Sequence, residues 1–478
     1  MLRSLAFALM ITAPATAAPN QLPATAAPNQ TPATAAPGRT PATPTRTAQA
    51  ASIRDAALAT SAAYPILESL TTEVGQRLAG SAAEARGRDW AVRAMTAAGL
   101  ANVHVEAFAL PVWERGAETA DIIGGSAQKL VVTALGRSGA TQAAGVTAPV
   151  VYFADLQALK DAGAGTLAGK IAFIDHHMMR AQDGSSYGTN NAVRTQGPAI
   201  AATKGAAATL IRSLGTGNGR DPHTGVTVTP KGQAPSPSGA LSLADADQLV
   251  RLLMRGPVSI KLVLTPRFTG TGQSGNVVGE LPGSTAPGEI IVIGGHLDSW
   301  DLGTGAIDDG AGMAITLAAA KAIKDSGLTP RRTVRVVFWG AEEVGGEGGD
   351  AYAAAHRADT IVLAAESDFG ADRVYRLSSK VAGSGLPLIA EMQRVLAPLG
   401  VAPTKDNAAG GGADVGPLGA LGSGILELEQ EGTRYFDLHH TPNDTLDKVD
   451  KAQLDQNVAA YAAAVWLAAS DDRPLRTK

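Results

Sequence analysis

The pattern of apolar and polar positions changes along the chain. Between residues 48 and 100 apolar residues recur at helical spacing, and Gly80-Ser81 interrupts them, which predicts two helices. Residues 103–110 alternate between apolar and polar positions as a strand does, and residues 111–116, beginning with a proline, are expected to close it. The folded part of the chain is therefore expected to begin with helices, followed by a strand.

The central part of the chain has a different texture, in which short strands alternate with glycine-rich loops. Strands are expected at residues 129–134, 148–153 and 170–174, and a helix near residues 199–204. A compact unit of roughly 140 residues lies within the ordinary size of a domain. The pattern predicts a smaller β/α domain at residues 122–265.

From residue 276 onward, strands and amphipathic helices alternate. Strands are predicted at residues 276–280, 289–293, 333–339, 360–366, 374–377 and 424–428, and helices at 310–324, 349–357, 386–399 and 453–469. Strands separated by amphipathic helices indicate a mostly parallel sheet with helices on both faces. The predicted fold class is α/β, with residues 48–121 and 266–478 forming one domain that the smaller domain interrupts.

The N-terminus has the pattern of a secretory signal peptide over residues 1–18. Arg3 precedes an apolar segment at residues 5–13, and Ala15-Thr16-Ala17 has the small residues of a cleavage site. That segment is too short to span a bilayer, and no later stretch is expected to span one. Three near-copies of TAAPNQLPA follow, so residues 19–47 are predicted to be an extended, disordered tether. We expect an exported protein, periplasmic or extracellular.

The composition narrows the possible functions. Lys and Arg total 40 against 44 Asp and Glu, a net charge of −4, which carries no footprint of nucleic-acid binding. The chain has no cysteine, which excludes a thiol nucleophile, a disulfide framework and a thiolate metal site. A metal site would have to use histidine and carboxylate ligands, which suit open catalytic sites better than closed structural ones.

Candidate metal ligands follow the predicted strands. They are His296, Asp308, Glu343, Asp368 and His440. The carboxyl ends of parallel strands are where open α/β sheets bind their ligands. Two imidazoles and three carboxylates suffice for two metal ions if one carboxylate is shared. Two ions about 3.5–4 Å apart would activate water and polarise a peptide carbonyl, which is what peptide hydrolysis requires.

Two further carboxylates lie next to these ligands. Asp298 follows His296 by two residues and could orient its imidazole. Glu342 precedes Glu343 and would point elsewhere, which suits a general base. A single carboxylate at a strand end is usually a helix cap or a solvated loop residue, but five ligand positions that each follow a predicted strand, in this order, favour a site. The remaining histidines are interpreted as surface or packing residues: His104, His176, His177, His223 and His356.

At these residues the sequence resembles the di-zinc exopeptidases of the bacterial aminopeptidase type. The family pattern is His-x-Asp, Asp-Asp-x-x-Gly, Glu-Glu, Glu-x-Asp and His-[Ser/Thr]-x-x-Asp, matched at residues 296–298, 308–312, 342–343, 366–368 and 440–444. The stretches GHLDSWDLGTGAIDDG, WERG and VGQRLAGS resemble the carboxypeptidase Q-like branch. RTQG, LIRS and PHTG resemble its inserted protease-associated domain, and the resemblance covers residues 51–469.

The resemblance implies two zinc ions and a role for each residue. Asp308 would bridge the ions, His296 and Asp368 would complete one site, and Glu343 and His440 the other. Glu342 would be the general base for a zinc-bridging hydroxide. His440 is favoured over His439 because it stands two residues before Pro442 and four before Asp444. The family also implies a cis peptide between Asp308 and Asp309, and a homodimer.

The expected function is an exported di-zinc exopeptidase that hydrolyses short peptides, foremost dipeptides with free termini. A broad aminopeptidase that acts on longer peptides would carry the same motifs, so this alternative stays open. A non-catalytic, receptor-like binding module is a third candidate. It is disfavoured because neither a ligand nor the base is lost, and function is argued from the site rather than from the fold.

Overall fold

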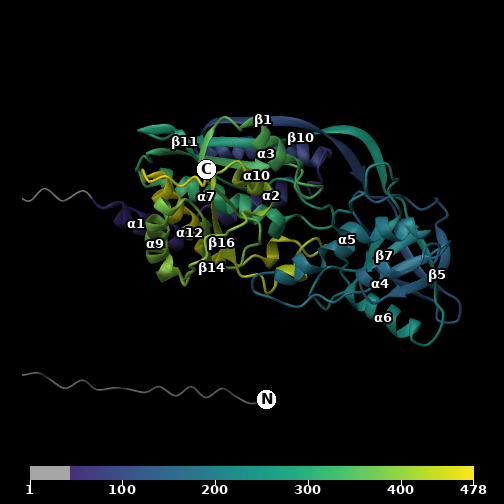
Figure 1. Ribbon diagram of the computed structural model, residues 1–478. Helices are drawn as coiled ribbons and strands as arrows, with labels where there is room; N and C mark the ends of the chain where they lie inside the picture. The colour runs from purple at the N-terminus through teal and green to yellow at the C-terminus, as the bar shows by residue number, and fades with distance from the viewer. Residues whose placement is uncertain (1–43) are drawn as a thin grey trace, which may run out of the picture. The chain divides into compact units, whose positions relative to one another are not determined.

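The structure is a computed structural model that describes residues 44–478 (Figure 1). The predicted signal peptide and residues 19–43 of the predicted tether lie outside this part. Helix α1 (Arg46–Ala59) begins before residue 47, where the tether was expected to end. The reason is a helix cap, because the Thr45 side chain accepts a hydrogen bond from the Ala48 N–H.

Three helices, rather than the two predicted, precede the first strand. They are α1, α2 (Ala63–Glu73) and α3 (Ala82–Ala97). The extra break follows α1, where the Ser61 hydroxyl accepts the Ala63 N–H and donates to Asp455 of a distant helix. At the predicted break, Ser81 and Glu84 cap α3 reciprocally. Ser81 accepts the Glu84 N–H, and Glu84 accepts the Gly80 N–H, one residue earlier than in a standard capping box.

The first sheet confirms the α/β prediction. Its strands are β1 (Ala101–Glu114), β10 (Arg267–Leu281), β11 (Ala286–His296), β12 (Arg332–Trp339), β13 (Thr360–Glu366), β14 (Val374–Lys380), β15 (Ala402–Pro403) and β16 (Gly424–Gln430). Their order is β1-β10-β12-β11-β13-β16-β14-β15. The central strands β12, β11, β13 and β16 run parallel, while β10 and β14 pair antiparallel on either side.

Strand β1 does not close at residue 111 as predicted. It continues through Pro111 and pairs with β10 as far as Glu114. Proline is tolerated here because β1 is the edge of the sheet, where one side of the strand needs no hydrogen-bond donor.

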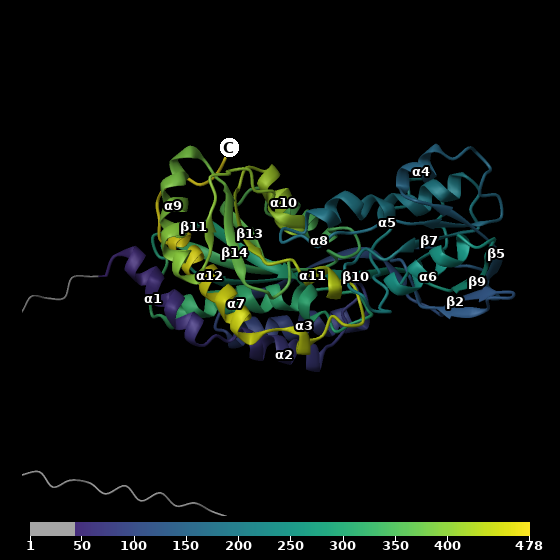
Figure 2. The ribbon, with the colours of Figure 1, turned by 90° about the horizontal axis from the view of Figure 1, so that it is seen from below.

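Helices cover both faces of the first sheet (Figure 2). Ile291 and Ile293 point into a core shared with α7 (Ala311–Asp325) and α12 (Lys451–Ala469). Ile290 and Val292 point into the opposite core, shared with α8 (Glu347–Ala355) and α10 (Gly412–Ala420). Since side chains alternate along a strand, the uninterrupted apolar run of β11 fills both cores. The remaining helices of this part are α9 (Leu386–Leu396) and α11 (Tyr435–Leu438).

A second sheet is built from the central part of the chain. Its strands are β2 (Glu118–Ile123), β3 (Gln128–Leu130), β4 (Val132–Ala134), β5 (Val146–Phe153), β6 (Ile171–Ile174), β7 (Ala208–Arg212), β8 (Ser238–Leu241) and β9 (Ser259–Leu264). Their order is β3-β2-β9-β5-β6-β7-β8-β4. Strand β2 begins ahead of the boundary predicted at residue 122 because it pairs with β9. That this part is a separate protease-associated domain stays a prediction.

Three helices accompany the second sheet: α4 (Leu156–Asp161), α5 (Ser185–Thr203) and α6 (Leu243–Leu253). Helix α5 is much longer than the predicted helix near residues 199–204. Its first half is polar and lacks an amphipathic pattern, so contacts with the rest of the fold must stabilise it. Among the helices of residues 44–478, none has both the length and the apolar character needed to cross a bilayer.

Candidate metal centre and active site

The predicted ligands lie where the strands of the first sheet end. His296 is the last residue of β11, and Asp308 lies further along the chain in the turn Ala306–Gly310, where its own backbone is not helical. Glu343 follows β12, and Asp368 follows β13. Because β12, β11 and β13 are adjacent and parallel, their carboxyl ends meet at one edge of the sheet. His440 joins them from the loop after α11.

The structure brings all five predicted ligands together around Asp308. One of its oxygens, Oδ1, lies 3.1 Å from His296 Nε2, and the other, Oδ2, lies 3.2 Å from His440 Nε2. His296 Nε2 is also 3.5 Å from Asp368 Oδ1, and His440 Nε2 is 2.9 Å from Glu343 Oε2. The Asp308 carboxylate thus lies between two imidazole–carboxylate pairs, which is the arrangement of a bridging ligand.

The chemistry of these residues fits metal ions. Groups of three potential ligand atoms lie within 4.8 Å of one another, among them His296, Asp308 and Glu343. Glu343 Oε1 and Asp308 Oδ2 are buried and accept no hydrogen bond. Buried carboxylate oxygens without donors are costly unless a cation neutralises them. Imidazole and carboxylate are also the ligands that zinc uses in catalytic sites.

Two other residues lie close enough to be ligands, Asp309 and His439. Each Asp309 carboxylate oxygen already accepts a hydrogen bond, from the N–H groups of His296 and Gly312 at 3.0 and 3.1 Å, which makes Asp309 a poorer candidate ligand. His439 Nε2 is 3.6 Å from Asp308, whereas His440 contacts both Asp308 and Glu343. The geometry favours His440 as the ligand, in agreement with the spacing argument.

Burial and neighbouring carboxylates raise the pKa of two glutamates at the site. Burial raises the pKa of Glu342 well above its ordinary range, and Asp368 and Glu343 add to the rise. Burial, with Asp368, also raises the pKa of Glu366 to about 8. Burial alone would lower the pKa of His440, but Glu343 and Asp308 reverse the effect and raise it. The site therefore has an excess of negative charge, which a divalent cation would relieve.

Asp298 contacts the His296 imidazole, as predicted, but through its backbone carbonyl and not through its carboxylate. The His296 Nδ1 lies 2.9 Å from the Asp298 backbone carbonyl, while the nearer carboxylate oxygen is 3.8 Å away. The carboxylate accepts the backbone N–H groups of Glu342 and Glu343 at 2.9 and 3.3 Å. Asp298 therefore holds the His296 ring through its backbone and the Glu342-Glu343 turn through its side chain.

The loop at residues 222–225, between β7 and β8, holds the histidine pair. The Thr224 carbonyl lies 3.2 Å from His440 Nδ1, and the Thr224 N–H donates to the His440 carbonyl at 3.0 Å. His223 Nδ1 donates to the His439 carbonyl at 2.7 Å, and burial lowers the pKa of His223 to about 3, so its ring is neutral. His223 was interpreted as a packing residue; its place in the PHTG motif was the available signal.

The turn that carries Asp308 is held by a carboxylate four residues after His440. Asp444, the last residue of the His-Thr-x-x-Asp motif, accepts the N–H groups of Ile307 and Asp308 at 2.5 and 3.3 Å. The peptide bond between Asp308 and Asp309 is cis, which confirms the expectation drawn from the family resemblance.

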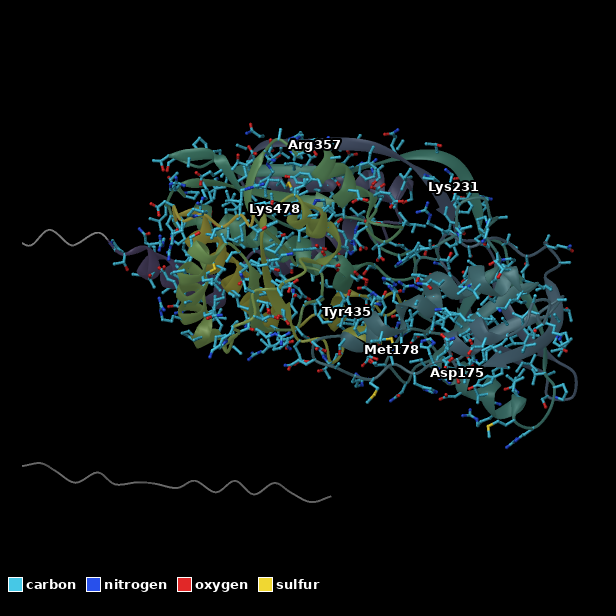
Figure 3. The ribbon with its side chains drawn as sticks, viewed as in Figure 1. Asp175, Met178, Lys231, Arg357, Tyr435 and Lys478 are labelled. Atoms are coloured by element: carbon cyan, nitrogen blue, oxygen red, sulfur yellow. The ribbon has the colours of Figure 1, made fainter. Side chains whose placement is uncertain are left out.

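A cavity of about 410 Å³ opens above these residues. Its lining from the first-sheet part includes Asp308, Glu342, Glu343, Asp368, Tyr435 and His440, and its lining from α5 includes Tyr187, Asn191, Arg194 and Thr195. Met178 and Tyr187 of the second-sheet part pack against the core that contains Tyr435; Figure 3 labels Met178 and Tyr435. The volume lies in the range of small-molecule sites, roughly 300–1,000 Å³.

Comparison with known proteins agrees with this site. Residues 276–465 match the model of peptidase family M28. Carboxypeptidase Q of Bos taurus is 33% identical over 413 residues, which cover 85% of this chain and 84% of that protein. The corresponding protein of Homo sapiens is 32% identical, with the same coverage.

Solved structures show the same fold. The Peptidase M28 precursor of Shewanella amazonensis SB2B is 46% identical and has a TM-score of 0.88, covering 90% of this chain and 98% of that one. An aminopeptidase of Aneurinibacillus sp. strain AM-1, 23% identical, has a TM-score of 0.59 and covers 90% of this chain and 97% of its own, a likeness of fold alone. This chain is therefore a metallopeptidase that belongs to peptidase family M28.

Proposed function

We propose that this metallopeptidase is a di-zinc exopeptidase that hydrolyses short peptides, foremost dipeptides with free termini. The observation that carries the proposal is the Asp308 carboxylate between two imidazole–carboxylate pairs at the floor of a cavity. The extensive similarity to carboxypeptidase Q supports an exopeptidase. A cavity of about 410 Å³ suits a short peptide better than an extended chain.

In this proposal, each predicted ligand has one role. His296, Asp368 and Asp308 would hold one zinc ion, and Glu343, His440 and the shared Asp308 would hold the other. Bound zinc would supply Lewis-acid activation of water and polarisation of the scissile carbonyl.

Glu342 is the proposed general base. Its side chain lines the cavity, and its backbone N–H is held by Asp298 beside the proposed ligand Glu343. The carboxylate would take the proton from the attacking water and pass it to the amine of the leaving group. Burial, with Asp368 and Glu343, raises the pKa of this carboxyl group above its ordinary range.

The test combines metal analysis with a variant of the base. The wild type is expected to hold two zinc ions per chain and to lose its activity when they are chelated. Glu342→Gln should keep the zinc and lower kcat by about 10²–10⁴-fold, the usual contribution of a general base. Glu347→Gln is a matched control, because Glu347 begins α8 just after the turn that carries Glu342 but pairs with Arg137. A Glu342→Gln enzyme that hydrolyses peptides at the wild-type rate would refute the mechanism.

A broad aminopeptidase is the second candidate function. It is favoured by the fold alone, which this chain shares with proteins named aminopeptidases. Product analysis on peptides of increasing length separates the two functions. Release of free N-terminal residues from long peptides would replace the dipeptidase proposal with this one.

The proposal includes export and domain organisation. The leader pattern of residues 1–18 supports secretion to the periplasm or beyond. The second sheet, whose strands all lie between Glu118 and Leu264, supports an inserted domain. Homodimerisation, which the family resemblance implies, stays a prediction.

A further inference from the structure

A buried arginine lies in the wall of the cavity. Arg194 comes from α5, beside the second sheet, and is only 4% exposed, yet its side chain lines the same cavity as the carboxylates. Among the described residues that line this cavity, Arg194 is the only lysine or arginine. The wall formed by α5 therefore carries a positive charge where the floor is acidic.

Arg194 has no carboxylate partner within residues 44–478. Its Nη2 donates to the Tyr187 hydroxyl at 2.7 Å, and its Nη1 has only two long contacts, at 3.4 Å, with the Thr224 carbonyl and with His440 Nδ1. Its Nε is buried and without a partner. A buried guanidinium without a counter-ion is costly, so an anion that enters the cavity would be strongly favoured beside it.

One of these long contacts disappears if His440 binds a metal. A neutral imidazole that coordinates through Nε2 carries its proton on Nδ1. That proton points at the Thr224 carbonyl, 3.2 Å away, so Nδ1 is then a donor and cannot accept a bond from Arg194. Nη1 therefore keeps only a long contact with a carbonyl, and Nη2 has a second N–H besides the one that Tyr187 accepts, so a ligand could receive one bond from each.

Packing fixes the orientation of the guanidinium. Its central carbon lies 5.5 Å from the centre of the Tyr187 ring, and Gly225 approaches it from another side. A Cβ at Gly225 would lie 2.1 Å from Nη1, so only glycine allows this close approach. Such fixation is what two-point recognition of a carboxylate by arginine needs.

We propose that Arg194 binds the free C-terminal carboxylate of the peptide substrate. The inference rests on the proposed exopeptidase function and names its specificity determinant. Arg194 lies one imidazole ring away from the ligand cluster, because Nη1 is 3.4 Å from His440 Nδ1. Successive residues are about 3.8 Å apart, so the carboxylate of the residue just beyond the scissile bond could reach it. The site would therefore select peptides that end one residue after the cleaved bond.

The test compares two substrates that differ only in this group, alanyl-alanine and alanyl-alaninamide. With the zinc-loaded wild type, the free acid should be the better substrate by at least about tenfold in kcat/KM. Arg194→Gln should raise KM for the acid by about 10–100-fold, the equivalent of one hydrogen-bonded charge pair. The same variant should change kcat/KM for the amide by less than about threefold, because the amide has no charge for Arg194 to bind. Arg194→Lys keeps the charge but not the planar fork, so its KM for the acid should lie between those of the wild type and Arg194→Gln.

Two further measurements separate binding from positioning. Zinc content should be equal in wild type and Arg194→Gln, and calorimetry should show weaker binding of free alanine to the variant. Arg180→Gln is the matched control. Arg180 also connects the second-sheet part to the first-sheet part, because it donates to the Thr433 carbonyl, but it does not line the cavity. The kinetic constants of Arg180→Gln for both substrates should therefore equal those of the wild type.

The outcomes distinguish this inference from the proposed function. If Arg194→Gln impairs both substrates equally, or loses zinc, then Arg194 positions His440 and does not bind the substrate carboxylate. If the wild type cleaves the acid and the amide equally well, the inference is wrong while the peptidase function stands. If the wild type cleaves neither, the proposed function itself fails.

Discussion

At the scale of single residues, Asp298 links three groups of the site. Its carbonyl accepts from His296 Nδ1, which leaves Nε2 free for a metal, and its carboxylate fixes the backbone of Glu342 and Glu343. The side chain is completely buried, so no water can replace the carboxylate. A change confined to this carboxylate should therefore affect the proposed base Glu342 and the proposed ligand Glu343, but not the His296 ring.

We predict that Asp298→Asn weakens zinc binding by about 10–100-fold, as is usual for residues that support metal ligands. The asparagine side chain has one acceptor oxygen and cannot accept both N–H groups well. Competition with a chromophoric chelator would measure the zinc affinity. Asp325→Asn serves as the control, because Asp325 forms only an exposed ion pair with Lys321. Unchanged zinc affinity in Asp298→Asn would contradict the role assigned to the carboxylate.

At the scale of elements, one arginine connects the N-terminal helices to the loop that follows β11. Arg77, between α2 and α3, is fully buried and donates to the carbonyls of Leu297, Thr304 and Gly305, which flank the turn that carries Asp308. Burial lowers the pKa of Arg77 to about 10, so it remains charged at neutral pH. The loop after β11 thus depends on a residue far away in the sequence.

We predict that Arg77→Met lowers the free energy of unfolding by on the order of 3 kcal/mol, because several buried carbonyls lose their donor. Denaturant titration of wild type and variant would measure the loss. Arg86→Met on α3 is the control, since Arg86 donates only to an exposed carbonyl of its own helix. Equal stability of Arg77→Met and wild type would show that the loop is held by other contacts.

At the scale of the whole molecule, the second-sheet part contributes residues to the cavity and contacts the two adjacent histidines of the site. Helix α5 supplies one wall of the cavity, and the loop at residues 222–225 holds His439 and His440. In Figures 1 and 2, α5 lies on the side of the second sheet that faces the first. Unfolding of the second-sheet part should therefore also release the contacts that hold His439 and His440 at the candidate metal centre.

Stability should fall in mild acid, and His176 of this part is one cause. Burial lowers its pKa from 6.5 to about 4, with Arg212 adding to the effect and Asp175 opposing it. Between these values the unfolded chain binds the proton and the folded chain does not. Stability is therefore full above about pH 6.5 and decreases as the pH falls toward 4. His176→Leu should reduce the loss between pH 7 and 5, measured as the shift of the denaturation midpoint. An identical loss in wild type and variant would contradict this.

Several features could be predicted from the sequence because their causes are local. The apolar run of β11 and the two glycines after it place His296 at a strand end, and similar runs place Glu343 and Asp368. The spacing of His440 from Pro442 and Asp444 selects the same histidine that the geometry favours. The absence of cysteine restricts a metal site to imidazole and carboxylate.

Other features depended on contacts between distant segments. The partner of the Asp298 carboxylate, the length of α5, and the contacts of His223 and Arg194 with the site were not predictable from local patterns. The sequence by itself determined the residue types of the candidate ligands and the strand ends that carry them, because periodicity and turn residues report local burial and local breaks. Tertiary structure alone decided which groups meet, because the order of strands and the packing of α5 set distances between segments that no local pattern encodes.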